Sequence, residues 1–355
     1  MQSFRFFINR DSPDRFVSSA AVLSMLLEVS GIPKPGNVSR FHNFSDTSFE
    51  HFLHSAAFVP FVFQDAFNRK KTFGELLYDS VKIKSERFGG NTHFGTFLLL
   101  IPLCMGAGSL FSKNDSFYSN ANINANIYEN INANIYENII VALKEKIAKE
   151  AHEICKNTSK GDSVFFYKSF WESNTFANEI DSSGPDSAFD LKSKNSESVI
   201  SAIEFENADL FSLMKSAKDR DLVANEWFSG FSKSLSFSKD LDYFYNFYSE
   251  NTNESLRFGS AINSAISASF LKFLAETPDT LIASKHGISE ALEIKKLFSN
   301  LLKKYDFYEI HNLNSLIPEL QMIDALMVSE NKNPGSLADI ASAGIFLSIL
   351  GGLKF

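Results

Sequence analysis

The sequence predicts a single all-α domain with a buried central helical hairpin, covering residues 1–355. Apolar residues, among them 37 phenylalanines, recur mostly at helical spacing. No run of alternating Val, Ile and Thr competes as a strand. A hydrophobic content of 44% is enough for a substantial core at this chain length. We therefore interpret the phenylalanines as core residues of a helical protein.

The first helix is predicted to begin at Asp11, Ser12 and Pro13, because Ser is a preferred cap and Pro fits the first turn. It should run to about Ser30 and be central, since apolar residues cover most of its circumference. A second helix is expected over residues 47–65. The apolar stretch 94–105 contains Pro102 and is shorter than the roughly 20 residues that cross a bilayer, so it predicts a buried helix.

Two low-complexity segments predict surface insertions at residues 112–126 and 172–197. The octet Ile-Asn-Ala-Asn-Ile-Tyr-Glu-Asn occurs twice in tandem over residues 123–138, where the first insertion should merge into a helix reaching Cys155. The second segment is rich in Ser, Asn and Asp, which bury little apolar area. Further helices are expected over residues 208–218, 221–237, 241–248, 256–275, 287–305, 317–329 and 337–350.

Charge and cysteine content exclude some classes of partner. The net charge is −8 and there is no run of Lys or Arg, which argues against nucleic acid. Cys104 and Cys155 lack metal-type spacing and indicate a reduced intracellular pair. The N-terminal segment does not resemble a signal peptide. We expect a cytoplasmic protein with no membrane partner.

A glycine-rich junction precedes the apolar helix and predicts a phosphate or carboxylate site. Two glycines interrupt the preceding segment, and polar residues then begin a new helix whose first N–H groups are unpaired. The alternative is a glycine break before a buried helix. The residues expected to bind substrate here are Gly89, Gly90, Asn91, Thr92 and His93.

Glu28 and Lys34 form a second candidate group. Glu28 falls in the last turn of the first helix, where the helix dipole disfavours a negative charge. The loop 31–38 contains two prolines and two glycines, so it can present Lys34 rigidly to a phosphate. The alternative is an exposed Glu28 paired with Lys34.

Four stretches together resemble the triphosphoribosyl-dephospho-CoA synthase family, in family order over nearly the whole chain. They are Glu28-Val29-Ser30 through Pro33-Lys34-Pro35-Gly36-Asn37-Val38, Phe88-Gly89-Gly90-Asn91-Thr92-His93-Phe94-Gly95, Pro278-Asp279-Thr280-Leu281-Ile282-Ala283-Ser284-Lys285-His286-Gly287 and Asn333-Pro334-Gly335-Ser336-Leu337-Ala338-Asp339-Ile340. The bacterial enzymes that act on dephospho-CoA carry a His and an Asp-Met-Asp after the Pro-Lys-Pro-Gly loop, whereas residues 40–50 here read Arg-Phe-His-Asn-Phe-Ser-Asp-Thr-Ser-Phe-Glu. Together with residues 220–227 this segment is more similar to the archaeal branch, in which the acceptor is open.

The resemblance implies a nucleotide-dependent transferase that moves the triphosphoribosyl group of ATP to dephospho-CoA and releases adenine. An oxocarbenium-like transition state needs carboxylates, and a triphosphate needs Mg²⁺ and cationic side chains. The expected catalytic acids are Glu28, Glu86, Asp279 and Asp339, with Glu86, Asp279 and Asp339 as Mg²⁺ ligands. Lys34 and Lys285 are the expected phosphate-binding cations.

Two other functions stay open at this point. One is phosphoribosyl transfer to another acceptor in the biosynthesis of a methanopterin-type coenzyme, and the other is a non-catalytic nucleotide-binding protein. Asp339 also has a structural alternative, because Ser336 and Asp339 have the spacing of a capping box.

Overall fold

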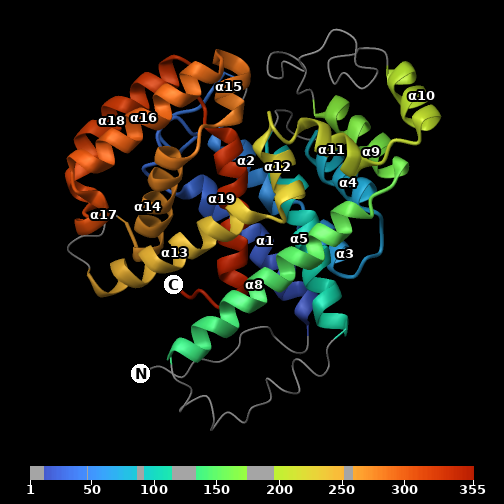
Figure 1. Cartoon of the computed structure of the whole chain (residues 1–355), viewed down its shortest axis with the longest axis horizontal. Coiled ribbons are helices and arrows are strands. Elements are labelled where there is room, and N and C mark those ends of the chain that lie inside the picture. Colours follow the sequence, from blue (N-terminus) through green and yellow to red (C-terminus); the bar gives the residue numbers. More distant parts are fainter. Residues whose placement is uncertain (1–11, 46, 86–91, 114–132, 174–195, 252–258) are drawn as a thin grey trace.

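Helices from opposite ends of the chain pack side by side at the centre of the molecule, namely α1 (Pro13–Ser30) and α19 (Gly335–Leu350) (Figure 1). The computed structural model describes residues 12–45, 47–85, 92–113, 133–173, 196–251 and 259–355. In these ranges every regular element is a helix, and an isolated bridge joins Ser39 and His42. The all-α fold class is confirmed.

The remaining helices surround this pair. In chain order they are α2 (Phe49–Ala57), α3 (Pro60–Phe67), α4 (Phe73–Ser85), α5 (Phe94–Lys113), α8 (Ala133–Lys156), α9 (Lys160–Glu172), α10 (Ser196–Glu206), α11 (Leu210–Ala217), α12 (Leu222–Ser229), α13 (Ser232–Glu250), α14 (Ala261–Glu276), α15 (Thr280–His286), α16 (Ile288–Lys304), α17 (Phe307–Ile310) and α18 (Leu313–Ser329).

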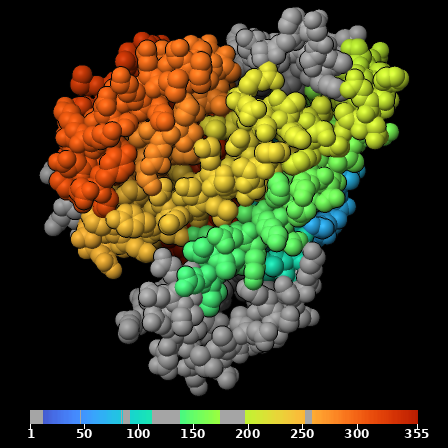
Figure 2. All heavy atoms as spheres, viewed as in Figure 1, coloured from blue at the N-terminus to red at the C-terminus, as the bar shows by residue number. Residues whose placement is uncertain are grey.

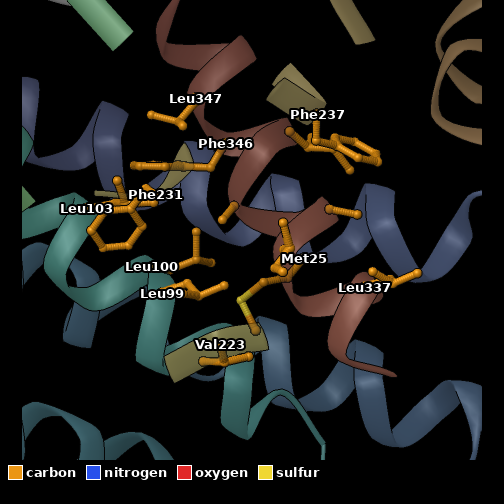
Figure 3. Packing of buried hydrophobic residues seen from close by; sticks show 14 of the residues in the cluster. Met25, Leu99, Leu100, Leu103, Val223, Phe231, Phe237, Leu337, Phe346 and Leu347 are labelled. Carbon is orange, nitrogen blue, oxygen red and sulfur yellow. The ribbon is translucent and has the colours of Figure 1, made fainter. Parts of the chain in front are cut away.

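One continuous apolar cluster joins helices from both halves of the chain. Figure 3 shows buried side chains of α1, α5, α12, α13 and α19 gathered in one region, among them Met25, Leu100, Val223, Phe237 and Phe346. Residues as far apart as Val17 and Leu350 belong to this cluster, so both ends of the chain share the main core, and a small second cluster contains Val29, Val38 and Phe49. In the space-filling view α19 is almost hidden behind the surrounding helices (Figure 2).

The hairpin formed by α5 and α8 is buried along α5 and along one face of α8. A Cβ atom on Gly106 of α5 would lie 2.7 Å from the carbonyl oxygen of Ile147 in α8, so only glycine permits this approach. Helix α5 extends to Lys113 and is therefore longer than the predicted apolar segment. The window Phe94–Phe111 is long and apolar enough to cross a membrane, but 83% of it is buried inside the fold, as expected of a core helix.

Two predicted helices are each divided in the structure. The helix predicted over 47–65 is α2 followed by α3, because Pro60 cannot continue a helix and instead begins the next one. The helix predicted over 221–237 ends at Ser229, because Gly230 adopts a left-handed φ of 71°. The predicted helix 241–248 is the second half of α13.

Both predicted insertions fall largely outside the described residues, which omit 114–132 and 174–195. Their edges coincide with helix ends. Helix α5 reaches Lys113, α9 ends at Glu172 and α10 begins at Ser196. The predicted helix through Cys155 is confirmed as α8, which ends at Lys156.

Candidate active site

Glu28 and Lys34 form a buried ion pair where α1 ends. The side chains are both nearly inaccessible, and Lys34 Nζ donates to Glu28 Oε1. Burial lowers the pKa of Lys34, and the charge of Glu28 opposes this effect. The sequence offered this pairing as one of two interpretations, and the structure contains it. That interpretation also placed Glu28 on the surface, which is wrong because Glu28 is buried. A buried pair of this kind is retained only with well-placed partners.

The loop after Lys34 is joined to the start of α19. Asn37 Nδ2 donates to Asn333 Oδ1 at 2.9 Å, immediately before the Pro334 that precedes α19. Asn37 is 5% exposed, and its Oδ1 atom has no hydrogen-bond partner among the described residues. A buried amide oxygen without a donor is costly, so it is a candidate acceptor for a ligand N–H or O–H group.

Asp339 belongs to α19 and its side chain faces the first turn of α5. Thr96 Oγ1 donates to Asp339 Oδ1 at 2.6 Å. A Cβ atom on Gly95 would lie 2.1 Å from Asp339 Oδ2, so the α5 backbone passes directly beside the carboxyl group. Gly95 is therefore required at this position because any other side chain would displace Asp339.

The capping-box interpretation of Asp339 is wrong. Helix α19 begins at Gly335, its N-terminal flanking residue is Pro334, and no side chain caps it. Asp339 is the fifth residue of the helix counted from Gly335, and it bonds to Thr96 of another helix instead of to its own helix end. The structure thus removes the structural explanation that the sequence offered for this acid.

Asp279 and Asp221 each cap a helix next to Asp339. Asp279 Oδ1 accepts from Ile282 N at 2.9 Å in α15, and its Oδ2 accepts from Leu337 N at 2.9 Å in α19. Asp221 accepts from Ala224 N at 2.7 Å in α12. Helices α12, α15 and α19 are linked further, because Thr280 Oγ1 accepts from Leu222 N and donates to Ser336 Oγ.

The pKa values of Asp279 and Asp339 are both raised, by burial and by the charges of neighbouring acids. Burial raises the pKa of Asp339 to about 8; the Thr96 hydrogen bond opposes this, and the charges of Glu28, Asp221 and Asp279 raise it further. Burial raises the pKa of Asp279 to about 6, against three backbone hydrogen bonds. Strongly perturbed carboxyl groups that gather at one place are typical of active sites.

The N-termini of four helices converge on this group. Gly95 and Thr96 belong to the first turn of α5, while α12, α15 and α19 begin at Leu222, Thr280 and Gly335. The positive end of each helix dipole lies at its N-terminus, although side-chain oxygens already accept from first-turn N–H groups of α12, α15 and α19. The site therefore offers both acids and a field that favours a polyanion.

His93 and Thr92 lie beside the same helix start. His93 has a left-handed φ of 61°, is 5% exposed, and its carbonyl accepts from Phe97 N at 2.8 Å. Its ring packs edge-on against Phe52, with centroids 4.9 Å apart. A positive φ in a non-glycine residue costs conformational energy and is commonest where function requires it.

Four of the predicted site residues lie outside the described residues, namely Glu86, Gly89, Gly90 and Asn91. Lys285 occupies the last turn of α15, at the end away from Asp279. Within the described ranges, no three His, Cys, Asp or Glu side chains are arranged to hold a metal ion.

Sequence reasoning missed Asp221, Thr96 and Asn37 as members of the site. Asp221 precedes an apolar run as a helix cap does, and Asn37 belongs to one of the four family-like stretches. The sequence therefore contained an indication for both residues. No sequence pattern indicates Thr96, because its bond to Asp339 depends on the packing of α5 against α19.

Comparison with solved structures finds a similar helical fold. A protein from Archaeoglobus fulgidus, described as a triphosphoribosyl-dephospho-CoA synthase, shares 22% sequence identity, with a TM-score of 0.55 over 85% of this chain and 100% of that one. At this identity the likeness supports the fold alone. A search of curated proteins found no match.

A match to a family model defines the protein as an all-helical transferase. The family model for CitG, ATP:dephospho-CoA triphosphoribosyl transferase, matches residues 14–354. The chain therefore belongs to the ATP:dephospho-CoA triphosphoribosyl transferase family. The reaction of this family moves the triphosphoribosyl group of ATP to dephospho-CoA.

Proposed function

We propose that ATP binds and reacts at the group formed by Glu28, Lys34, Asp221, Asp279 and Asp339. The observation that carries the proposal is that all four family-like stretches meet at Asp339. The 333–340 stretch contains Asp339, Gly95 packs against it, and Asp279 bonds to Leu337 two residues before it. Glu28 raises the pKa of Asp339, and Asn37 bonds to Asn333.

Asp339 is suited to donate a proton in the reaction. The C1′–N9 bond of ATP breaks, and adenine leaves as a neutral base after gaining a proton from Asp339. A hydroxyl of dephospho-CoA forms the new bond to C1′ and gives its proton to an ionised carboxylate of the group, so the two proton transfers balance. A carboxyl group with a pKa of about 8 holds a proton at neutral pH, as a general acid must. Thr96 fixes its orientation through Oδ1.

The remaining acids are suited to stabilise positive charge on the ribosyl group. With a pKa of about 6, Asp279 is largely ionised at neutral pH. Its two oxygens are fixed by backbone N–H groups, so its charge is preorganised and needs no reorganisation during the reaction. Asp221 adds a second carboxylate held by α12.

Lys34 and the helix N-termini are suited to bind the triphosphate. The Lys34 ammonium has three donors, and Glu28 Oε1 accepts from it, which leaves donor capacity for phosphate oxygens. The positive ends of the helix dipoles add a field that favours the phosphate charge. We extend the same role to Thr92 and His93 by their place at the start of α5, and retain it as a prediction for Gly89, Gly90, Asn91 and Lys285.

Mg²⁺ is proposed as the cofactor that accompanies ATP. The donor set fits, because Mg²⁺ in nucleotide sites is commonly held by one or two carboxylates together with phosphate oxygens and water. Asp221 is the best-placed candidate among the described acids, since Asp339 holds the proton that adenine needs and Asp279 already accepts a backbone N–H at each oxygen. Glu86 retains its predicted role. When bound, the cation would neutralise part of the triphosphate charge.

Calorimetric titration of ATP with and without Mg²⁺ tests the proposed site. Lys34→Ala should weaken ATP binding by about tenfold or more, because a charge-assisted hydrogen bond to phosphate is lost. Lys70→Ala is the matched control, since Lys70 pairs with Asp65 on the surface at 2.8 Å. Failure of ATP to bind under either condition would contradict the proposal.

A further inference from the structure

One face of α14 holds the two residues that precede Lys34. Asn263 Oδ1 accepts from Ile32 N at 3.0 Å, and Asn263 Nδ2 donates to Ile32 O at 2.7 Å. Ser267 Oγ donates to Pro33 O. The backbone before Lys34 is thus bonded through side chains more than 200 positions away in the sequence.

The same helix face also contacts Lys34 itself. Lys34 Nζ lies 5.2 Å from the centroid of the Phe270 ring. Asn263, Ser267 and Phe270 are spaced by four and three residues, which places them on one side of a helix. A Cβ atom on Gly31 would lie 2.7 Å from Ile266 Cγ2, so the loop is in direct contact with α14 along this side.

The far end of the loop is held by other elements. Gly36 N donates to Asp324 Oδ1 at 2.8 Å in α18, and Gly36 has a φ of 81° that favours glycine. Lys34 therefore lies between two anchored backbone segments. Because burial disfavours a charged ammonium, its position depends on this support as well as on Glu28.

We propose that Asn263 and Ser267 are positioning residues for Lys34, setting the location of its ammonium for the ATP phosphates. The inference rests on the proposed function of Lys34. A displacement of about 1 Å at a catalytic group can lower rate by about a hundredfold, so bonds that fix the adjacent backbone affect turnover without touching substrate. Asn263 and Ser267 then act only through Lys34.

A double-mutant cycle distinguishes this role from general support of the fold. Asn263→Ala and Ser267→Ala should each lower kcat/KM for ATP by about tenfold. In a Lys34→Ala background the same changes should have an effect of about twofold or less, because the group that they position is absent. ATP affinity, measured by calorimetry, should follow the same pattern.

Ser269→Ala provides the matched control. Ser269 lies on α14 two residues from Ser267, is 1% exposed, and its Oγ has no hydrogen-bond partner among the described residues. It should leave kcat/KM unchanged in both backgrounds. Should Asn263→Ala fail to fold, Ser267→Ala removes a single hydrogen bond and decides the question alone.

The rate of amine labelling at Lys34, followed by peptide mass spectrometry, gives a readout independent of activity. Asn263→Ala should raise this rate several-fold while labelling of Lys70 stays constant. Equal losses of kcat/KM in the Lys34 and Lys34→Ala backgrounds, or unchanged labelling, would overturn the inference. A Lys34→Ala enzyme with full activity and full ATP affinity would instead overturn the proposed role of Lys34.

Discussion

Replacing Asp339 with Asn should separate function from stability at the centre of the site. Asn has nearly the same shape and can still accept the hydrogen bond from Thr96 through its amide oxygen. It cannot donate an acidic proton or carry a negative charge. The substitution therefore removes the proposed chemistry while leaving the packing of α19 against α5 in place.

The effect on stability follows from the pKa of Asp339. Folding raises this pKa from 3.8 to about 8, so between these values the folded protein holds a proton that the unfolded chain releases. The free energy of unfolding then falls as pH rises from about 4 to about 8. The full shift corresponds to about 6 kcal/mol. Because the side chain is partly exposed, solvent screening leaves an expected effect of about 1–2 kcal/mol.

Asp339→Asn lacks this titration, so it should be about 1–2 kcal/mol more stable than the parent protein at pH 8 and nearly equal to it at pH 4. Turnover should fall at least about a hundredfold. Denaturant unfolding at the two pH values measures the first effect, and adenine release measures the second. Asp209→Asn, which alters the cap of α11, should retain full turnover. Normal turnover in a folded Asp339→Asn protein would refute the assignment of Asp339.

Three further changes test other parts of the account. Gly95→Ala should lower turnover at least about tenfold, because the added methyl displaces the Asp339 carboxyl; an unchanged rate would show that the carboxyl can move freely. Asp279→Ala should lower the free energy of unfolding by about 2–4 kcal/mol, since the N–H groups of Ile282 and Leu337 lose their acceptors, and a smaller loss in denaturant melts would contradict its structural role. ATP with Mg²⁺ at about 100 times Kd should add about 2.7 kcal/mol to stability in thermal melts, whereas equal protection without Mg²⁺ would argue against the proposed cofactor.

The all-α fold class and most helix positions could be predicted from the sequence because they depend on local patterns of residues. The start of α1 at Pro13 and the segment of α19 follow from capping preference and apolar content. The divisions at Pro60 and Gly230 were missed, although both residues are ordinary helix breakers. The apolar periodicity continues through both residues, so it predicted one helix at each place where the structure has two.

The site was predicted as separate residues but not as an arrangement. Glu28 and Lys34 were found from the helix end and the rigid loop, and Asp279 and Asp339 through motif resemblance. Their mutual contacts depend on tertiary packing. The bond from Thr96 to Asp339 joins residues 243 positions apart. Periodicity cannot indicate such a contact, so the sequence instead suggested a local capping box for Asp339.

Product analysis tests the central claim most directly. The protein is incubated with ATP, Mg²⁺ and dephospho-CoA, free adenine is quantified by chromatography, and the acceptor is weighed by mass spectrometry. The account predicts one adenine released for each dephospho-CoA that gains a triphosphoribosyl group, with neither product formed by Asp339→Asn. Release of ADP or AMP instead of adenine, or an acceptor of unchanged mass, would contradict it.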